Sequence, residues 1–212
     1  MSNKKVINFI YKNKTFYEDY FHNNRLSKCN YGYTCDIDQI YCYLNLIDIK
    51  KTVYFDFYNV VNAYFDIDNM NLLEVACGYI PILSAIYKNN GINIDAINNK
   101  ILIKNYRGIN TIEYDLNKPY DLSKYDLIIG IRPCYITENI IDNCYKYKKD
   151  FILYLCPCIH NSKDGKVFDN YKNWINYLKF KTSNFANYNI KFEYFNFFPD
   201  KCPVVIGKCV KH

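Results

Sequence analysis

The sequence has no apolar run long enough to cross a membrane. Its longest runs, Asp126 to Ile131 and Phe151 to Leu155, are far shorter than the roughly 20 residues that a membrane-spanning helix needs. The N-terminus also lacks the pattern of a secretion signal, because charged residues from Lys12 to Asp19 interrupt it and no small-residue cleavage site follows. We therefore expect a cytoplasmic protein without membrane contact.

Glycine and histidine are scarce, with seven and three residues among 212. Neither a phosphate-binding P-loop nor the three-glycine turn of a dinucleotide site occurs, and no Ser-His-Asp or paired-carboxylate constellation is apparent. The sequence thus disfavours an NAD-dependent oxidoreductase and offers little acid–base machinery.

Cysteine and aromatic residues are abundant, with ten Cys, 24 Tyr and 14 Phe. Because the chain is long and lacks a secretion signal, we expect reduced thiols and no structural disulfide. Codons rich in adenine and thymine favour Tyr and Phe as well as Asn, Lys and Ile, so these aromatics are not evidence for stacking on bases. The net charge of +6 permits an acidic partner such as RNA without indicating one, and no obligate protein partner is evident.

Two regions, 1–68 and 69–212, differ in their hydrophobic pattern. The first has helical spacing and predicts an N-terminal helical extension, which would act as a lid over the site or cover a sheet edge. One predicted helix could be capped by Asp36 and would run to Ile47, and another would cover Val53 to Tyr64.

From residue 70, short β-like runs alternate with helical ones, which is typical of a parallel sheet built from βαβ units. The predicted strands are Leu72 to Ala76, Ile92 to Ile97, Thr111 to Tyr114, Leu127 to Ile131 and Ile152 to Leu155. The predicted helices are Ile82 to Asn89, Lys100 to Tyr106, Ile136 to Lys148 and Tyr171 to Phe180.

The chain ends in two strand-like runs, within IKFEYFNFFPDKCPVVIGKCV. Only a short loop at 199–201 separates them, and parallel neighbours would need a longer crossover, so they must form an antiparallel pair. The predicted fold class is therefore α/β: a doubly wound seven-stranded sheet with five parallel strands and a C-terminal antiparallel hairpin.

The segment NLLEVACGYIPILSAIYK carries the strongest functional pattern. It predicts a strand with the acid Glu74 at its end, a turn through Gly78, and a helix that begins at Pro81. A glycine lets the backbone approach a ligand closely, and proline is preorganised for the first helical position. The start of this helix should therefore face a ligand.

This segment resembles the first motif of class I S-adenosylmethionine-dependent methyltransferases, whose fold is Rossmann-like. In that family an acid ends the first strand and a glycine-rich turn follows. The three glycines correspond here to Ala76, Gly78 and Ile80, so only the central one is kept. The resemblance implies S-adenosylmethionine as the cofactor, with Glu74 near the amino end of its methionine and Gly78 under its ribose.

The resemblance extends to the next two strands. Asn98 stands where the family has a ribose-binding acid, and Asp115 in IEYDLNKP matches the acceptor for the adenine amine. Asparagine can hydrogen-bond hydroxyls but lacks the charge that strengthens such bonds. The full set of expected cofactor-binding residues is Glu74, Ala76, Cys77, Gly78, Tyr79, Pro81, Asn98, Asp115, Ile131 and Arg132.

The ends of the fourth and fifth strands should form the catalytic edge, since ligands bind outside strand ends near the switch point. The run Gly130 to Cys134 resembles a Gly-x-Arg/His-x-Cys variant of the family's fourth motif, which pairs with a Cys/His-rich end of strand five, here Cys156, Cys158 and His160. The spacing C-x-C-x-H is tighter than a zinc knuckle, so we expect no metal. The residues expected to face the cofactor or acceptor are Arg132, Pro133, Cys134, Thr137 and Glu138.

The candidate catalytic residues are His160, Glu138, Arg132 and Cys134. His160 is the nearest candidate base, because its imidazole titrates near neutral pH, and Glu138 is the second.

Two functions stay open. The leading one is a methyltransferase (EC 2.1.1.-) that transfers a methyl group to an unknown acceptor, either a small molecule or RNA. The alternative is a non-catalytic S-adenosylmethionine-binding module, which the degenerate glycine turn and Asn98 suggest. An RNA acceptor would suit the lysines between residues 146 and 172, whereas a small molecule would need an enclosed pocket lined by Cys134, Tyr135 and tyrosines of the N-terminal helices.

Overall fold

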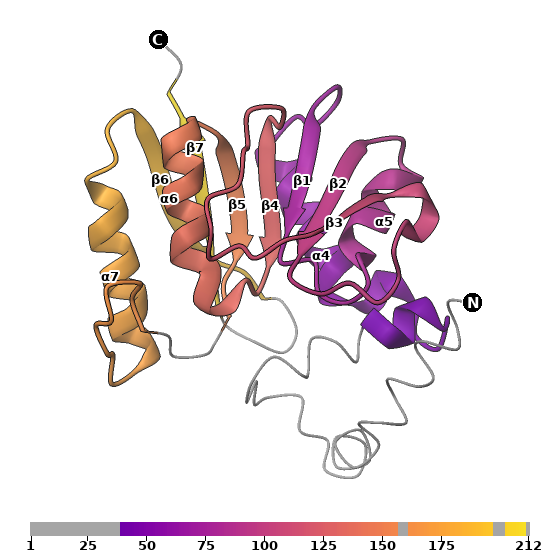
Figure 1. Cartoon of the computed structure of the whole chain (residues 1–212), viewed down its shortest axis with the longest axis horizontal. Helices are drawn as coiled ribbons and strands as arrows, with labels where there is room; N and C mark the ends of the chain where they lie inside the picture. The colour runs from indigo at the N-terminus through magenta and orange to yellow at the C-terminus, as the bar shows by residue number, and fades with distance from the viewer. Residues whose placement is uncertain (1–38, 157–160, 197–201, 211–212) are drawn as a thin grey trace.

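The computed structural model describes residues 39–156, 161–196 and 202–210, and Figure 1 shows their arrangement. Residues 39–43 are helical. The other helices are η1 (Ile49–Lys51), α4 (Val53–Tyr64), α5 (Ile82–Asn89), η2 (Tyr106–Gly108), η3 (Cys134–Ile136), α6 (Thr137–Tyr147) and α7 (Tyr171–Ser183). The strands are β1 (Asn71–Val75), β2 (Asn93–Asn98), β3 (Asn110–Glu113), β4 (Leu127–Ile131), β5 (Asp150–Tyr154), β6 (Tyr188–Tyr194) and β7 (Pro203–Cys209).

The seven strands form one sheet in the order β3-β2-β1-β4-β5-β7-β6. The first five are parallel to one another, and β7 pairs antiparallel with both β5 and β6. The chain order reverses between β1 and β4, which is the switch point of the sheet. This topology confirms the predicted doubly wound sheet with its C-terminal hairpin.

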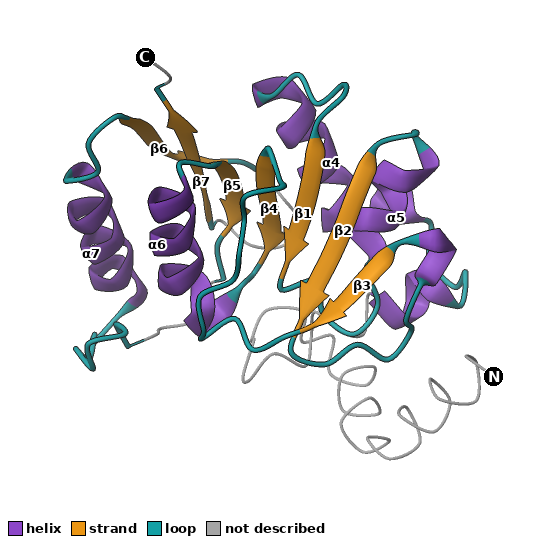
Figure 2. Cartoon of the chain, turned by 45° about the horizontal axis from the view of Figure 1, so that its top comes forward, coloured by secondary structure: helices purple, strands orange, loops and turns teal. Residues whose placement is uncertain are grey.

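Helices cover both faces of the sheet: α4 and α5 lie on one face, α6 and α7 on the other (Figure 2). Each strand contributes apolar side chains to the cores on both faces of the sheet, because successive side chains point to opposite faces. Leu127 and Ile129 belong to the core with α4 and α5, whereas Ile128 between them packs in the core with α6 and α7. The apolar run of β4 is therefore buried on both sides, as expected of a central parallel strand.

Helix α4 is an integral part of this core. Its residues Phe57 and Val61 are fully buried in the same cluster as Leu72 of β1.

The division of the chain into an extension (1–68) and a domain (69–212) stays a prediction. No helix in the described part of the chain is long and apolar enough to span a membrane.

The predicted helix from Lys100 to Tyr106 is wrong. The structure has turns there and only the short η2, with Asn105 and Arg107 at left-handed φ values of 54° and 51°. Ile101 is buried in a small cluster between α5 and β2 without adopting a helix, and its N–H donates to Glu113 at 3.0 Å. The apolar spacing of this segment thus reflects a packed loop that connects β2 to β3.

Several helix boundaries also differ from the prediction: α6 begins one residue later and ends one residue earlier, and α7 continues to Ser183 instead of Phe180. Pro81 is not the first helical residue but precedes α5 as its N-cap, with φ −75° and ψ 73°. The helix expected to reach Ile47 ends by residue 43, because Asn45 takes a left-handed φ of 57°. Its proposed cap, Asp36, lies outside the described residues.

Candidate functional site

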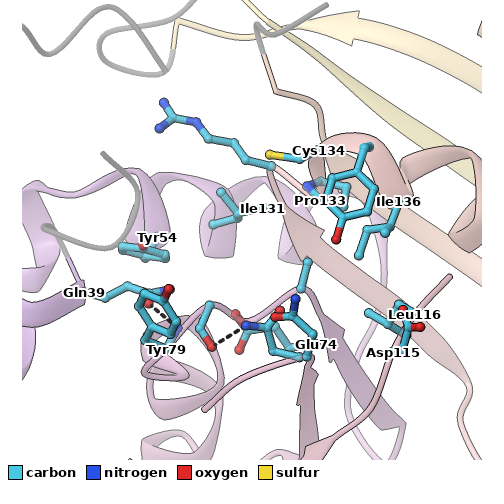
Figure 3. Close-up of a pocket in the computed structure, with 16 residues that line it drawn as sticks. Gln39, Tyr54, Glu74, Tyr79, Asp115, Leu116, Ile131, Pro133, Cys134 and Ile136 are labelled. Atoms are coloured by element: carbon cyan, nitrogen blue, oxygen red, sulfur yellow. Dashed lines mark hydrogen bonds between the residues drawn. The ribbon is translucent and has the colours of Figure 1, made fainter. Parts of the chain in front are cut away.

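A cavity of about 270 Å³ opens at the carboxyl ends of β1, β2, β3 and β4, beside the switch point (Figure 3). Side chains from four strand ends and from the N-terminal helices line it. The lining residues are Gln39, Tyr54, Glu74, Ala76, Gly78, Tyr79, Asn98, Asn99, Asp115, Leu116, Ile131, Arg132, Pro133, Cys134, Tyr135 and Ile136. Small-molecule sites of this fold class occur at this edge of the sheet.

Glu74 is the buried acid of the site, 2% exposed near the end of β1. Its Oε2 accepts hydrogen bonds from the N–H of Ser84 at 2.9 Å and from the Ser84 hydroxyl at 2.5 Å, in the first turn of α5. Burial raises the pKa of Glu74 to about 7, although the bonds from Ser84 act in the opposite direction. Glu74 is therefore poised to change its charge near neutral pH or when a cation approaches.

The turn after β1 has an unusual backbone. Ala76 and Gly78 both have positive φ values, 54° and 72°. A left-handed conformation costs a residue with a Cβ roughly 1–2 kcal/mol, which explains why glycine suits these positions. Ala76 stands where the resembling family has its first glycine, and it still adopts the left-handed conformation. The turn therefore forms without that glycine.

The ends of β2 and β3 contribute Asn98 and Asp115. The Nδ2 of Asn98 donates to the carbonyls of Gly78 at 2.9 Å and Lys100 at 3.0 Å. Asp115 is exposed to the cavity, and its Oδ1 accepts from the N–H and the side-chain amide of Asn117 at 3.0 and 2.9 Å. These bonds lower the pKa of Asp115, so it is a carboxylate at neutral pH.

The segment after β4 forms the opposite wall. Arg132 and Cys134 have left-handed φ values of 52° and 53°, and the Arg132 guanidinium lies over the ring of Tyr154 at 5.7 Å. The Arg132 N–H donates to the Tyr154 carbonyl at 2.7 Å, and the Cys134 carbonyl accepts from the Thr137 hydroxyl at 2.7 Å. Non-glycine residues in this region of φ cluster at functional sites.

The structure brings most of the predicted site residues together. Those that line the cavity are Glu74, Ala76, Gly78, Tyr79, Asn98, Asp115, Ile131, Arg132, Pro133 and Cys134. Cys77, Pro81 and Thr137 are buried and are not in the lining. His160 and Cys158 lie outside the described residues, as do the other two histidines.

Glu138 is not in the cavity lining either. Its side chain accepts hydrogen bonds from Tyr177 at 2.8 Å, from the Lys163 N–H at 2.8 Å and from the Lys181 ammonium at 2.6 Å. Burial favours a raised pKa for Glu138, but these bonds outweigh it and hold the pKa below its ordinary value. The geometry thus gives Glu138 a role in joining α6 to α7, away from the cavity.

The lysines considered for an RNA acceptor do not gather at the cavity. Lys148 and Lys149 directly precede β5, so they lie at the amino end of that strand, whereas the cavity is at the carboxyl ends. Lys163 pairs with Asp142 at 2.5 Å. Within the described ranges, no group of three or more Cys, His, Asp or Glu side chains could hold a metal ion.

Sequence reasoning missed four lining residues, Gln39, Asn99, Leu116 and Ile136, and expected Tyr54 only as one of the tyrosines of the N-terminal helices. Leu116 and Asn99 directly follow Asp115 and Asn98, so a wider window around the strand ends would have found them. Gln39 is 35 residues before Glu74 and has no local pattern that signals its position.

Comparison with protein-family models finds no match, and comparison with curated proteins finds none either. Solved structures do match. The plantazolicin methyltransferase BpumL in complex with S-adenosylhomocysteine has a TM-score of 0.52 at 14% identity, over 98% of this chain and 99% of that one. The magnesium protoporphyrin IX methyltransferase ChlM from Synechocystis PCC 6803 with bound S-adenosylmethionine has a TM-score of 0.51 at 13% identity, over 92% of this chain and 95% of that one.

The chain has the class I methyltransferase fold. Both matches extend over nearly the whole of each chain. At these identities the likeness is one of fold, and the chemistry must be argued from the residues of the cavity.

Proposed function

We propose that this protein is an S-adenosylmethionine-dependent methyltransferase. One observation carries the proposal: a single cavity collects the acid of β1, the Gly78 turn, Asn98 at the end of β2 and Asp115 after β3. This is the order of groups that the resemblance to the class I cofactor motifs implies. Figure 3 shows Glu74 and Asp115 in the same cavity, with Ile131 and Pro133 on the wall above them.

The chemistry of these residues fits the cofactor. S-adenosylmethionine carries an ammonium group, and a neighbouring cation would favour the ionised form of the buried Glu74. Asp115 is already a carboxylate and can accept from the adenine amine. Asn98 donates both of its bonds through Nδ2, so Oδ1 can accept from a ribose hydroxyl.

The cofactor would supply an activated methyl group, so the protein needs to provide position, electrostatics and a dry site. Glu74 would balance positive charge at the buried end of the cavity. Three of the lining side chains, Leu116, Ile131 and Ile136, are apolar and buried, so they would present a dry wall to the cofactor. His160 stays the proposed base for acceptors that need one.

A small-molecule acceptor suits this site better than RNA. Cys134, Tyr135 and the N-terminal Tyr54 line the same cavity, which is the arrangement expected for a small acceptor. Tyr135 is 58% exposed at the rim and offers a ring on which an entering acceptor could stack.

Calorimetric titration with S-adenosylhomocysteine tests the cofactor site. We expect the wild-type protein to bind it and Asp115→Ala to weaken binding at least about tenfold, because a charge-assisted hydrogen bond contributes roughly 1.5–3 kcal/mol. Asp121→Ala is the matched control. The Oδ1 of Asp121 also accepts a hydrogen bond within an exposed turn, from the Ser123 N–H at 2.8 Å, but Asp121 does not line the cavity. Equal weakening by both variants, or no binding by the folded wild type, would contradict the proposal.

Turnover distinguishes the enzyme from the alternative, a binding module without catalysis. The protein is incubated with methyl-labelled S-adenosylmethionine and separate small-molecule and RNA fractions of a cell extract. Label in the small-molecule fraction is the result we expect. Binding of the cofactor without label in any fraction would favour the module.

A further inference from the structure

The turn after β1 is clamped by a side chain from far outside the cofactor motif. The Nε2 of Gln39 donates to the carbonyl of Cys77 at 2.8 Å. Its Oε1 accepts from the N–H groups of Tyr79 at 3.0 Å and Ile80 at 3.2 Å. One amide side chain thus satisfies three backbone groups on both sides of Gly78.

Gly78 and Gln39 are complementary in shape. A Cβ on Gly78 would lie 2.3 Å from the Nε2 and 2.5 Å from the Oε1 of Gln39, closer than real Cβ atoms approach. The space that the glycine leaves open is therefore filled by the Gln39 amide. This glycine is needed for the clamp as well as for the left-handed turn.

The clamp is held firmly in place. Gln39 is 4% exposed, and the next residue, Ile40, is 2% exposed in the core that α4 and α5 share. Buried amide groups are costly unless they are hydrogen-bonded, and here both ends of the Gln39 amide are. The N-terminal helix therefore anchors a side chain whose polar atoms all engage the turn.

We propose that Gln39 is a positioning residue of the cofactor site, which fixes the conformation of the turn from Ala76 to Ile80 before the ligand binds. The proposal rests on the proposed function for the identity of the ligand. In this chain two of the three glycines of the motif are replaced, by Ala76 and Ile80. The hydrogen bonds of Gln39 hold the turn in its conformation. Preorganisation of this kind raises affinity because the turn need not be ordered on binding.

The test compares Gln39→Met, which has about the same length but no amide, with Ile40→Val, which alters the buried neighbour on the same helix and keeps the Gln39 amide. Two quantities are measured: hydrogen exchange of the Tyr79 and Ile80 amides without ligand, and the dissociation constant for S-adenosylhomocysteine. For Gln39→Met we expect both amides to exchange faster and the affinity to fall about tenfold, the equivalent of one ordinary hydrogen bond. Ile40→Val should change the affinity less than twofold.

Gln39→Asn gives the same test with a milder change, should Gln39→Met fail to fold. Its side chain is one methylene shorter and cannot reach the Cys77 carbonyl and the two amides together, so the affinity should again fall. If wild type binds S-adenosylhomocysteine and the Gln39 variants bind it equally well or more tightly, the role of Gln39 is refuted while the proposed function stands. If the folded wild type does not bind it, the proposed function fails, and unchanged exchange at Tyr79 and Ile80 would refute the clamp independently.

Discussion

Glu74 should make the stability of the protein depend on pH in a direction opposite to that of most carboxylates. Its ordinary pKa of 4.5 applies to the unfolded chain, and burial raises the pKa to about 7 in the folded chain. Between these values the folded state binds more protons than the unfolded state, so stability falls as the pH rises. At about 1.4 kcal/mol for each unit of pH, Glu74 costs the folded state about 3 kcal/mol once it is fully ionised.

Glu74→Gln isolates this effect, because the amide is uncharged at every pH and its oxygen can still accept from Ser84. Urea unfolding of both proteins at pH 5 and pH 8 gives the difference in their free energies of unfolding. We expect wild type to lose about 2–3 kcal/mol relative to Glu74→Gln over this interval. If the difference in free energy of unfolding between the two proteins changes by less than about 1 kcal/mol from pH 5 to pH 8, the assignment of a raised pKa to Glu74 is refuted.

Three further substitutions test the rest of the structure by urea unfolding. Ala76→Gly should stabilise the protein by about 1 kcal/mol, because Ala76 has a φ of 54°; an unchanged or lower stability would argue against a strained turn. Glu138→Ala should cost about 1–3 kcal/mol, since the Tyr177 hydroxyl and the Lys163 N–H lose their acceptor while Lys181 keeps Asp142 at 2.9 Å, yet it should leave the affinity for S-adenosylhomocysteine within twofold. A large loss of affinity at full stability would restore Glu138 to the site. Gly207→Ala should cost about 1–3 kcal/mol, because its Cβ would meet the ring of Phe151 at 2.2 Å, and a neutral result would show that β7 can shift on β5.

The sheet could be predicted because its strands are short apolar runs with clear ends. The predicted β4, Leu127 to Ile131, agrees with the structure residue for residue, and the predicted helix that ends at Asn89 differs only in its start, since Pro81 caps it. The short loop before Pro203 required the antiparallel hairpin, which the structure has. The segment after Lys100 misled because a packed loop buries apolar side chains at spacings that a helix also produces.

The cavity was predictable only where its residues follow strands. The carboxyl ends of parallel strands meet at one edge, so Glu74, Asn98 and Asp115 could be placed together from the sequence. The direction of the Glu138 side chain could not, since it depends on how α7 packs against α6. The contact of Gln39 with the turn depends on tertiary packing in the same way.

The structure of the protein determined with bound S-adenosylhomocysteine tests the central claim most directly. We predict that the ligand occupies the cavity beside the Gly78 turn, with its amino group toward Glu74 and its adenine amine on Asp115. A ligand bound elsewhere on the molecule, or a cavity that stays empty at saturating ligand concentration, would contradict the assignment of this cavity as the cofactor site.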